Sequence, residues 1–148
     1  MSMRLVLIKV SQSLLDRLVA SKGALLIALS ENKIAGFSRP ADVEDSIDYR
    51  DISVEAEDPD SLIRTIIDGG VIFSNDLQWA YTHPAWHSVD KVKALARELP
   101  AMAARHRALE QRIYPDTDEA DIGWPVGRIA DFFTRAAAEG KAVVVGVA

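Results

Sequence analysis

Two short apolar segments at opposite ends of the chain constrain its fold most. Residues 3–10 read Met-Arg-Leu-Val-Leu-Ile-Lys-Val, and residues 142–147 read Ala-Val-Val-Val-Gly-Val. Each has the length of a strand, contains β-branched residues and is apolar at consecutive positions, which is typical of a strand buried on both faces. We expect the two segments to share one sheet, with the rest of the chain between them.

Helical patterns fill much of the sequence between these two segments. We expect one helix after Ser11 or Ser13, a second from Asp58-Pro59-Asp60 to Gly69-Gly70, and a last one from Pro125 to Gly140. Residues 31–58 are rich in acidic side chains and predict a loop, with one strand near residues 52–56. Strands and helices do not alternate strictly. The sequence therefore predicts one α+β domain over residues 1–148, with a small mixed sheet packed against several helices.

The longest helical pattern follows Ser88, which is a good helix cap. An apolar stripe with steps of three and four residues consists of Val92, Leu95, Leu99, Met102, His106, Leu109 and Ile113. Such a stripe predicts the buried face of a helix. It runs through Pro100, and proline disrupts a helix interior, so we expect two helices that meet there rather than one kinked helix. We expect His106 to be a hydrogen-bonded core residue rather than a catalyst.

The basic residues of this region lie off the apolar stripe. They are Lys91, Lys93, Arg97, Arg105, Arg107 and Arg112. A solvated helix face is the simpler interpretation, and contact with an acidic partner is the alternative.

Composition excludes several classes of protein. The 148 residues carry a net charge of −5, and the basic residues are not clustered, which argues against a nucleic-acid partner. Cysteine is absent, so disulfides, thiolate metal sites and a cysteine nucleophile are excluded. The longest apolar runs are too short for a signal peptide or a membrane span. We therefore expect a cytoplasmic protein that does not contact a membrane.

Motifs for cofactor binding and catalysis are missing from the sequence. There is no glycine-rich phosphate loop, no HExxH and no G-x-S-x-G. The acidic run 116–121 lacks the glycine and the glutamate that a calcium loop of the EF-hand type needs at its sixth and twelfth positions. We expect no cofactor.

Two groups of aromatic residues are the candidate contact residues for a ligand or partner. The first group lies between residues 79 and 88 and consists of Trp79, Tyr81, His83, Trp86 and His87. A metal site there is disfavoured, because Pro84 breaks the helix that would align the histidines and no third ligand is apparent. The simpler interpretation is that these aromatics pack beneath a loop.

The second group is Tyr114 and Trp124, which bracket the acidic run. We expect their rings to anchor that loop onto the core. The alternative is a binding groove that they form together with Trp86.

Several segments resemble the YfbM-like family of bacterial proteins, a family of unknown function. The resemblance covers the first thirty residues and residues 85–148, including Ile113-Tyr114-Pro115 followed by Trp124. The tryptophan that this family often carries before its middle helix is absent here. The resemblance implies a compact α+β fold in the bacterial cytoplasm, and it implies no activity.

Three hypotheses for function follow. The first is a small binding protein with a protein partner, in one version an immunity-like protein whose exposed acidic patch (Asp42, Glu44, Asp45 and Asp48) neutralises a basic partner. The second is a hydrolase that uses His83 or His87 as a base with a carboxylate. The third is a structural homodimer, and the sequence leaves open whether the chain is a monomer or a homodimer.

Overall fold

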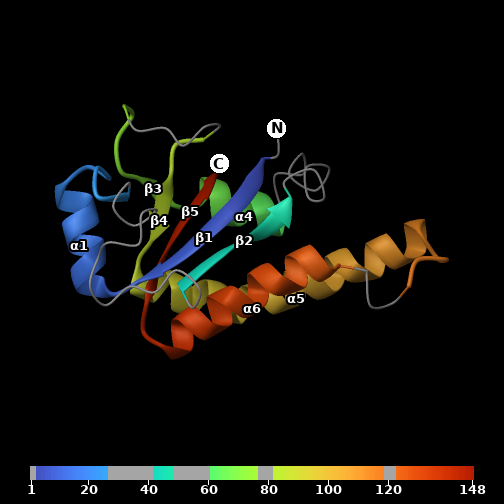
Figure 1. Ribbon diagram of the computed structural model, residues 1–148. Helices are drawn as coiled ribbons and strands as arrows, with labels where there is room; N and C mark the ends of the chain where they lie inside the picture. The colour runs from blue at the N-terminus through green and yellow to red at the C-terminus, as the bar shows by residue number, and fades with distance from the viewer. Residues whose placement is uncertain (1–2, 27–41, 49–60, 77–81, 119–122) are drawn as a thin grey trace.

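A five-stranded sheet forms the centre of the molecule. The computed structural model describes residues 3–26, 42–48, 61–76, 82–118 and 123–148 (Figure 1). The strand order is β2-β1-β5-β4-β3. The strands are β1 Arg4–Val10, β2 Val43–Asp48, β3 Val71–Ile72, β4 Ala85–His87 and β5 Ala142–Val147.

The first and last strands pair with each other at the middle of this sheet. Leu5 lies opposite Val147 and Val10 lies opposite Ala142, so the two strands are antiparallel along their whole length. Backbone hydrogen bonds between Arg4 and Ala148 extend the pairing by one residue. The prediction that these segments share a sheet is confirmed. The α+β class is confirmed as well, but every strand pairing is antiparallel, so the expected mixed sheet is wrong in that detail.

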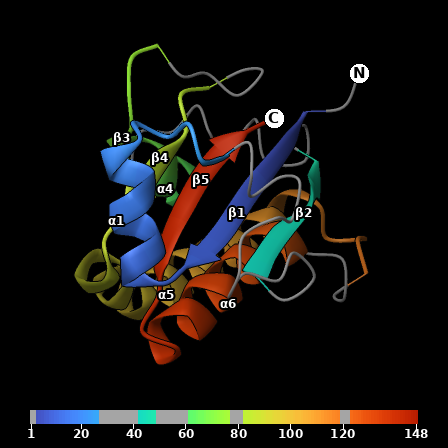
Figure 2. The same cartoon turned by 60° about the vertical axis from the view of Figure 1, so that its left-hand side comes forward.

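Helices cover both faces of the sheet (Figure 2). Helix α1 (Gln12–Ala20) lies on one face, and α4 (Leu62–Asp68), α5 (Val89–Ile113) and α6 (Trp124–Ala138) lie on the other. Side chains alternate along a strand, so Leu5 and Leu7 of β1 join the core under α5 and α6, whereas Ile8 and Val10 join the core under α1. This two-sided burial explains why both central strands are apolar at nearly every position.

Two local predictions are wrong. β2 lies in the segment predicted as a loop, because its inner-face residue Ile47 is fully buried although three of the six residues of the strand are acidic. Helix α4 begins at Leu62 rather than near residue 59, since the Ser61 side chain caps it by accepting a hydrogen bond from the backbone of Arg64. The strand expected near residues 52–56 lies outside the described residues.

Helix α5 is continuous through Pro100, so the prediction of two helices is wrong. The proline is exposed, whereas Leu95, Leu99 and Ala103 around it are buried on one common face. Packing of that face keeps the two halves in line, and a proline on the solvent side leaves the carbonyl four residues back accessible to water. Tertiary contacts thus outweigh the local cost of the proline.

Replacement of Pro100 by alanine tests this explanation. Pro100→Ala restores one helical hydrogen bond and removes a steric clash, so we expect the free energy of unfolding to rise by about 1–2 kcal/mol, less than the full difference in helix propensity because the unfolded chain gains freedom. Urea unfolding followed by circular dichroism measures it. A loss of stability would show that the helix requires a bend at this point.

Candidate functional site

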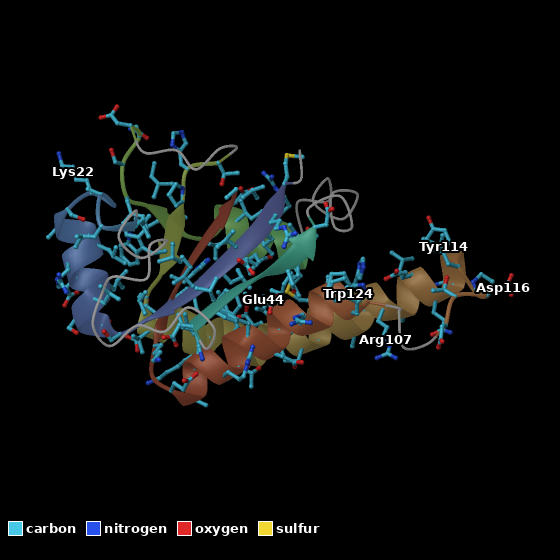
Figure 3. The ribbon with its side chains drawn as sticks, in the orientation of Figure 1. Lys22, Glu44, Arg107, Tyr114, Asp116 and Trp124 are labelled. Atoms are coloured by element: carbon cyan, nitrogen blue, oxygen red, sulfur yellow. The ribbon has the colours of Figure 1, made fainter. Side chains whose placement is uncertain are left out.

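Helix α5 extends beyond the rest of the molecule. Its 25 residues span about 38 Å at 1.5 Å per residue. The neighbouring helix α6 starts beside Arg107, where a side chain added at Gly123 would lie 3.1 Å from the Arg107 Cβ atom. Residues 108–113, about 9 Å of helix, therefore reach past the start of α6. Figure 3 shows Tyr114 and Asp116 at this far end, with Trp124 and Arg107 closer to the sheet.

The start of α6 is attached to α5 through Glu110. Gly123 is the N-terminal cap of α6, has a φ of 67° and supplies no capping side chain. The Glu110 carboxylate accepts a hydrogen bond of 3.0 Å from the Gly123 backbone and lies 3.4 Å from His106 Nε2. A carboxylate at a helix N-terminus satisfies an unpaired N–H group and complements the helix dipole. His106 is thus half-buried beside Glu110 rather than in the core, which corrects its predicted position.

The apolar stripe of α5 is longer than the surface that covers it. Leu95 and Leu99 are fully buried beneath the sheet and its helices. Beyond them the same stripe emerges, with Leu109 53% exposed and Ile113 58% exposed. Tyr114 is 60% exposed and Trp124 is 39% exposed at this end of the molecule. We call these four residues, Leu109, Ile113, Tyr114 and Trp124, the tip.

The expected role of Tyr114 as a core anchor is wrong, because 60% of this residue is exposed, whereas Trp124 is 39% exposed and thus more covered than open. A groove formed with Trp86 is wrong too. Trp86 lies in β4, just before α5 begins, and Tyr114 caps the other end of that helix. The length of α5 therefore lies between the two positions, and Figure 1 shows β4 in the sheet and the end of α5 projecting away from it.

Within the aromatic segment 79–88, the described residues 82–88 do not form one contact loop. Trp79 and Tyr81 lie outside the described residues, and His83 is exposed. Trp86 and His87 are neighbours in β4, so their side chains point to opposite faces. Trp86 packs against the core under α1, and the His87 ring meets the Phe133 ring of α6 edge to face.

His87 is the most buried polar side chain of the described residues, at 1% exposure. Its Nε2 atom lies 2.7 Å from the carbonyl oxygen of Ile66 in α4, which makes Nε2 the protonated nitrogen, and Nδ1 has no hydrogen-bond partner. Burial lowers the pKa of His87, the bond to Ile66 partly offsets this, and the charge of Lys91 lowers the pKa further. The ring is therefore neutral near pH 7.

This geometry argues against His87 as the base of the hydrolase hypothesis, which leaves His83 as the other candidate that the hypothesis named. A general base must reach its substrate and is commonly oriented by a carboxylate, but His87 is inaccessible and its partner is a backbone carbonyl. Among the described residues no group of three histidine or carboxylate side chains is placed to hold a metal ion.

Two of the four acidic residues of the predicted exposed patch are buried, and the other two, Asp45 and Asp48, are half-buried, which corrects that expectation. Asp42 and Glu44 are both buried. Asp42 lies 3.2 Å from Lys141 Nζ, and Glu44 accepts a hydrogen bond of 2.9 Å from Arg128 and others from Ser46. Burial raises the pKa of Glu44, but the bonds from Ser46 and Arg128 outweigh it, so the pKa is lowered.

Lys9 extends this ionic cluster to the end of α6. Its side chain follows Leu7 on the same face of β1, is buried, and donates a hydrogen bond of 2.6 Å to Glu139. Asp42 lies 4.0 Å away, and the ammonium group also lies 5.9 Å from the centre of the Phe132 ring. The hydrogen bond from Lys9 lowers the pKa of Glu139. The cluster joins β1, α6 and the start of β2.

Comparisons with known proteins give no match: no family model, no curated protein and no solved structure is similar to this chain. The resemblance to the YfbM-like family stays a prediction. No helix within the described ranges has the length and apolar character that crossing a membrane requires.

Removal of the buried ammonium group tests the ionic cluster. Lys9→Met should lower the free energy of unfolding by about 1–2 kcal/mol at pH 7, toward the low end for a charged hydrogen bond because Glu139 is partly exposed. The pKa of Glu139 is depressed, so its contribution is present above the ordinary carboxyl pKa and lost as the pH falls. The difference from wild type should therefore shrink near pH 3. Lys93→Met, at an exposed position of α5, should be neutral, and equal effects of the two variants would contradict this account.

The pH dependence of stability tests His87. Its pKa is depressed in the folded protein, so the unfolded chain binds more protons below about pH 6.5 and stability falls there as the pH decreases. We expect the free energy of unfolding of the wild type to fall between pH 7.5 and pH 5.5. This fall should be smaller in His87→Asn, and it should be unchanged in His83→Gln, which alters an exposed position. Chemical unfolding at the two pH values measures it, and an unchanged pH dependence in His87→Asn would refute the assignment.

Proposed function

We propose that this protein is a protein-binding module and that the tip of α5 and α6 is its contact surface, occupied by a segment of another protein chain. The observation that carries the proposal is the exposed continuation of the buried stripe at Leu109 and Ile113. Soluble domains seldom keep several large apolar side chains together in solvent unless they meet a partner. Tyrosine and tryptophan, present here as Tyr114 and Trp124, are also the residues enriched where proteins bind each other.

The position of the tip supports a role in binding rather than in folding. Leu109 and Ile113 are exposed and belong to neither buried core, so they add little to the packing on which the fold depends. The helix that carries them is held at its other end by the sheet, and close to the tip by the hydrogen bond from the Gly123 backbone to Glu110. A rigid, projecting helix end loses little conformational freedom on binding.

Stability measurements separate a binding role from a packing role. Leu109→Ser combined with Ile113→Ser should change the free energy of unfolding by no more than about 0.5 kcal/mol, as expected for surface positions. Leu99→Ala, on the buried part of the same stripe, should cost about 2–5 kcal/mol. A large loss in the double variant would show that the tip belongs to the fold.

Site-specific cross-linking tests the binding itself. A photoreactive phenylalanine derivative replaces Leu109 in the native host, and the same replacement at Val19, an exposed apolar position on α1, is the control. We expect one protein to be cross-linked from position 109 and not from position 19. The purified partner should then bind the wild-type chain and fail to bind the double variant. Equal cross-linking from both positions, or none from position 109, would refute the proposal.

A further inference from the structure

We infer that the partner of the tip presents an apolar segment flanked by carboxylates, an inference that rests on the proposed function. The argument starts from the charges beside the exposed part of the stripe. On a regular helix, Arg105 and Arg112 lie about 40° and 60° to one side of Leu109. Both arginines are exposed. One edge of the apolar surface is therefore positively charged, although the chain as a whole has a net charge of −5.

The opposite edge of the stripe does not offer an acidic side chain to a partner. Glu110, about 100° to the other side of Leu109, is directed to the Gly123 backbone and to His106 within the molecule. Along the helix, the charge beside Leu109 and Ile113 is thus that of the arginines, whereas the exposed Asp116 and Asp118 follow Tyr114 beyond the end of the helix. Guanidinium groups bind carboxylates through paired hydrogen bonds, so an acidic partner fits this edge best.

A second copy of the chain fits this surface poorly. If two α5 helices paired in parallel, they would have to contact each other along the whole apolar stripe, including Leu95 and Leu99. These two residues are already buried in the molecule's own core. In an antiparallel pair related by a two-fold axis, equivalent edges of the two helices face each other. Arg105 and Arg112 of one copy would then meet the same arginines of the other copy, and like charges repel. The arginine edge therefore selects another protein over self-association.

A pair of designed peptides probes this chemistry directly. One is an amphipathic helical peptide with leucines at steps of three and four residues and glutamates along both edges, and the other has lysines in place of the glutamates. Binding is followed by the fluorescence anisotropy of the labelled peptide. We expect the acidic peptide to bind at least about tenfold more tightly than the basic one, and to weaken as salt rises from about 0.05 to about 0.5 M.

Charge-matched variants assign the effect to the arginine edge. The double variant Arg105→Glu with Arg112→Glu should bind the acidic peptide about tenfold or more weakly, because attraction is lost and repulsion is added. Lys93→Glu with Arg97→Glu changes the net charge equally on exposed positions of the same helix that lie away from Leu109, and should have little effect. Equal losses in the two double variants would mean attraction by overall charge and would overturn the inference.

The other outcomes separate this inference from the proposed function. If both peptides bind equally and Leu109→Ser with Ile113→Ser abolishes both, the tip is a docking surface but its partner is not acidic. If neither peptide binds, or if sedimentation shows a dimer that the same double variant dissociates, the acidic partner is refuted. The cross-linking experiment at position 109 does not depend on the peptide results. It would therefore reveal a failure of the proposed function even if the peptide measurements gave no answer.

Discussion

The pairing of β1 with β5 is the interaction on which the rest of the structure depends. These two strands form the middle of the sheet, and every residue of β5 is buried. The inner row of their side chains supports α4, α5 and α6, and the outer row supports α1. Even the ionic cluster follows from this pairing, because Lys9 continues the inner row of β1 to the end of α6. Without the central pair, neither layer of helices has a surface on which to pack.

The sequence allowed the central strands and the ends of several elements to be predicted, because local patterns determine them. Consecutive apolar residues indicated β1 and β5, Ser88 was correctly expected to cap α5, and Pro125 was correctly expected at the start of α6. Each of these signals depends on a few neighbouring residues. The pairing of the two end segments could also be inferred, since two strands buried on both faces need neighbours on both sides.

The features that were predicted wrongly depend on contacts between distant residues. A proline inside a helix is tolerated at position 100 only because packing aligns the turns on either side. The acidic strand β2 is possible because Arg128 and Lys141, both far away in the sequence, neutralise Glu44 and Asp42. The tip is a case of the same kind. Periodicity correctly identified the stripe from Val92 to Ile113, but it contains no information on where the covering sheet stops.

The order of the strands along the chain also determines when the sheet can be completed during synthesis. Within this domain β1 is translated before every other strand and its partner β5 after every other strand, so β1 must wait while the elements between them are made. Pairings between such distant segments form slowly, because the entropy cost of closing a long loop comes before any favourable contact between the strands is made. Throughout that interval β2 can pair with one edge of β1, but the edge that β5 will occupy is exposed to other chains. Edge-to-edge association with other chains therefore competes with folding until β5 fills its place in the sheet.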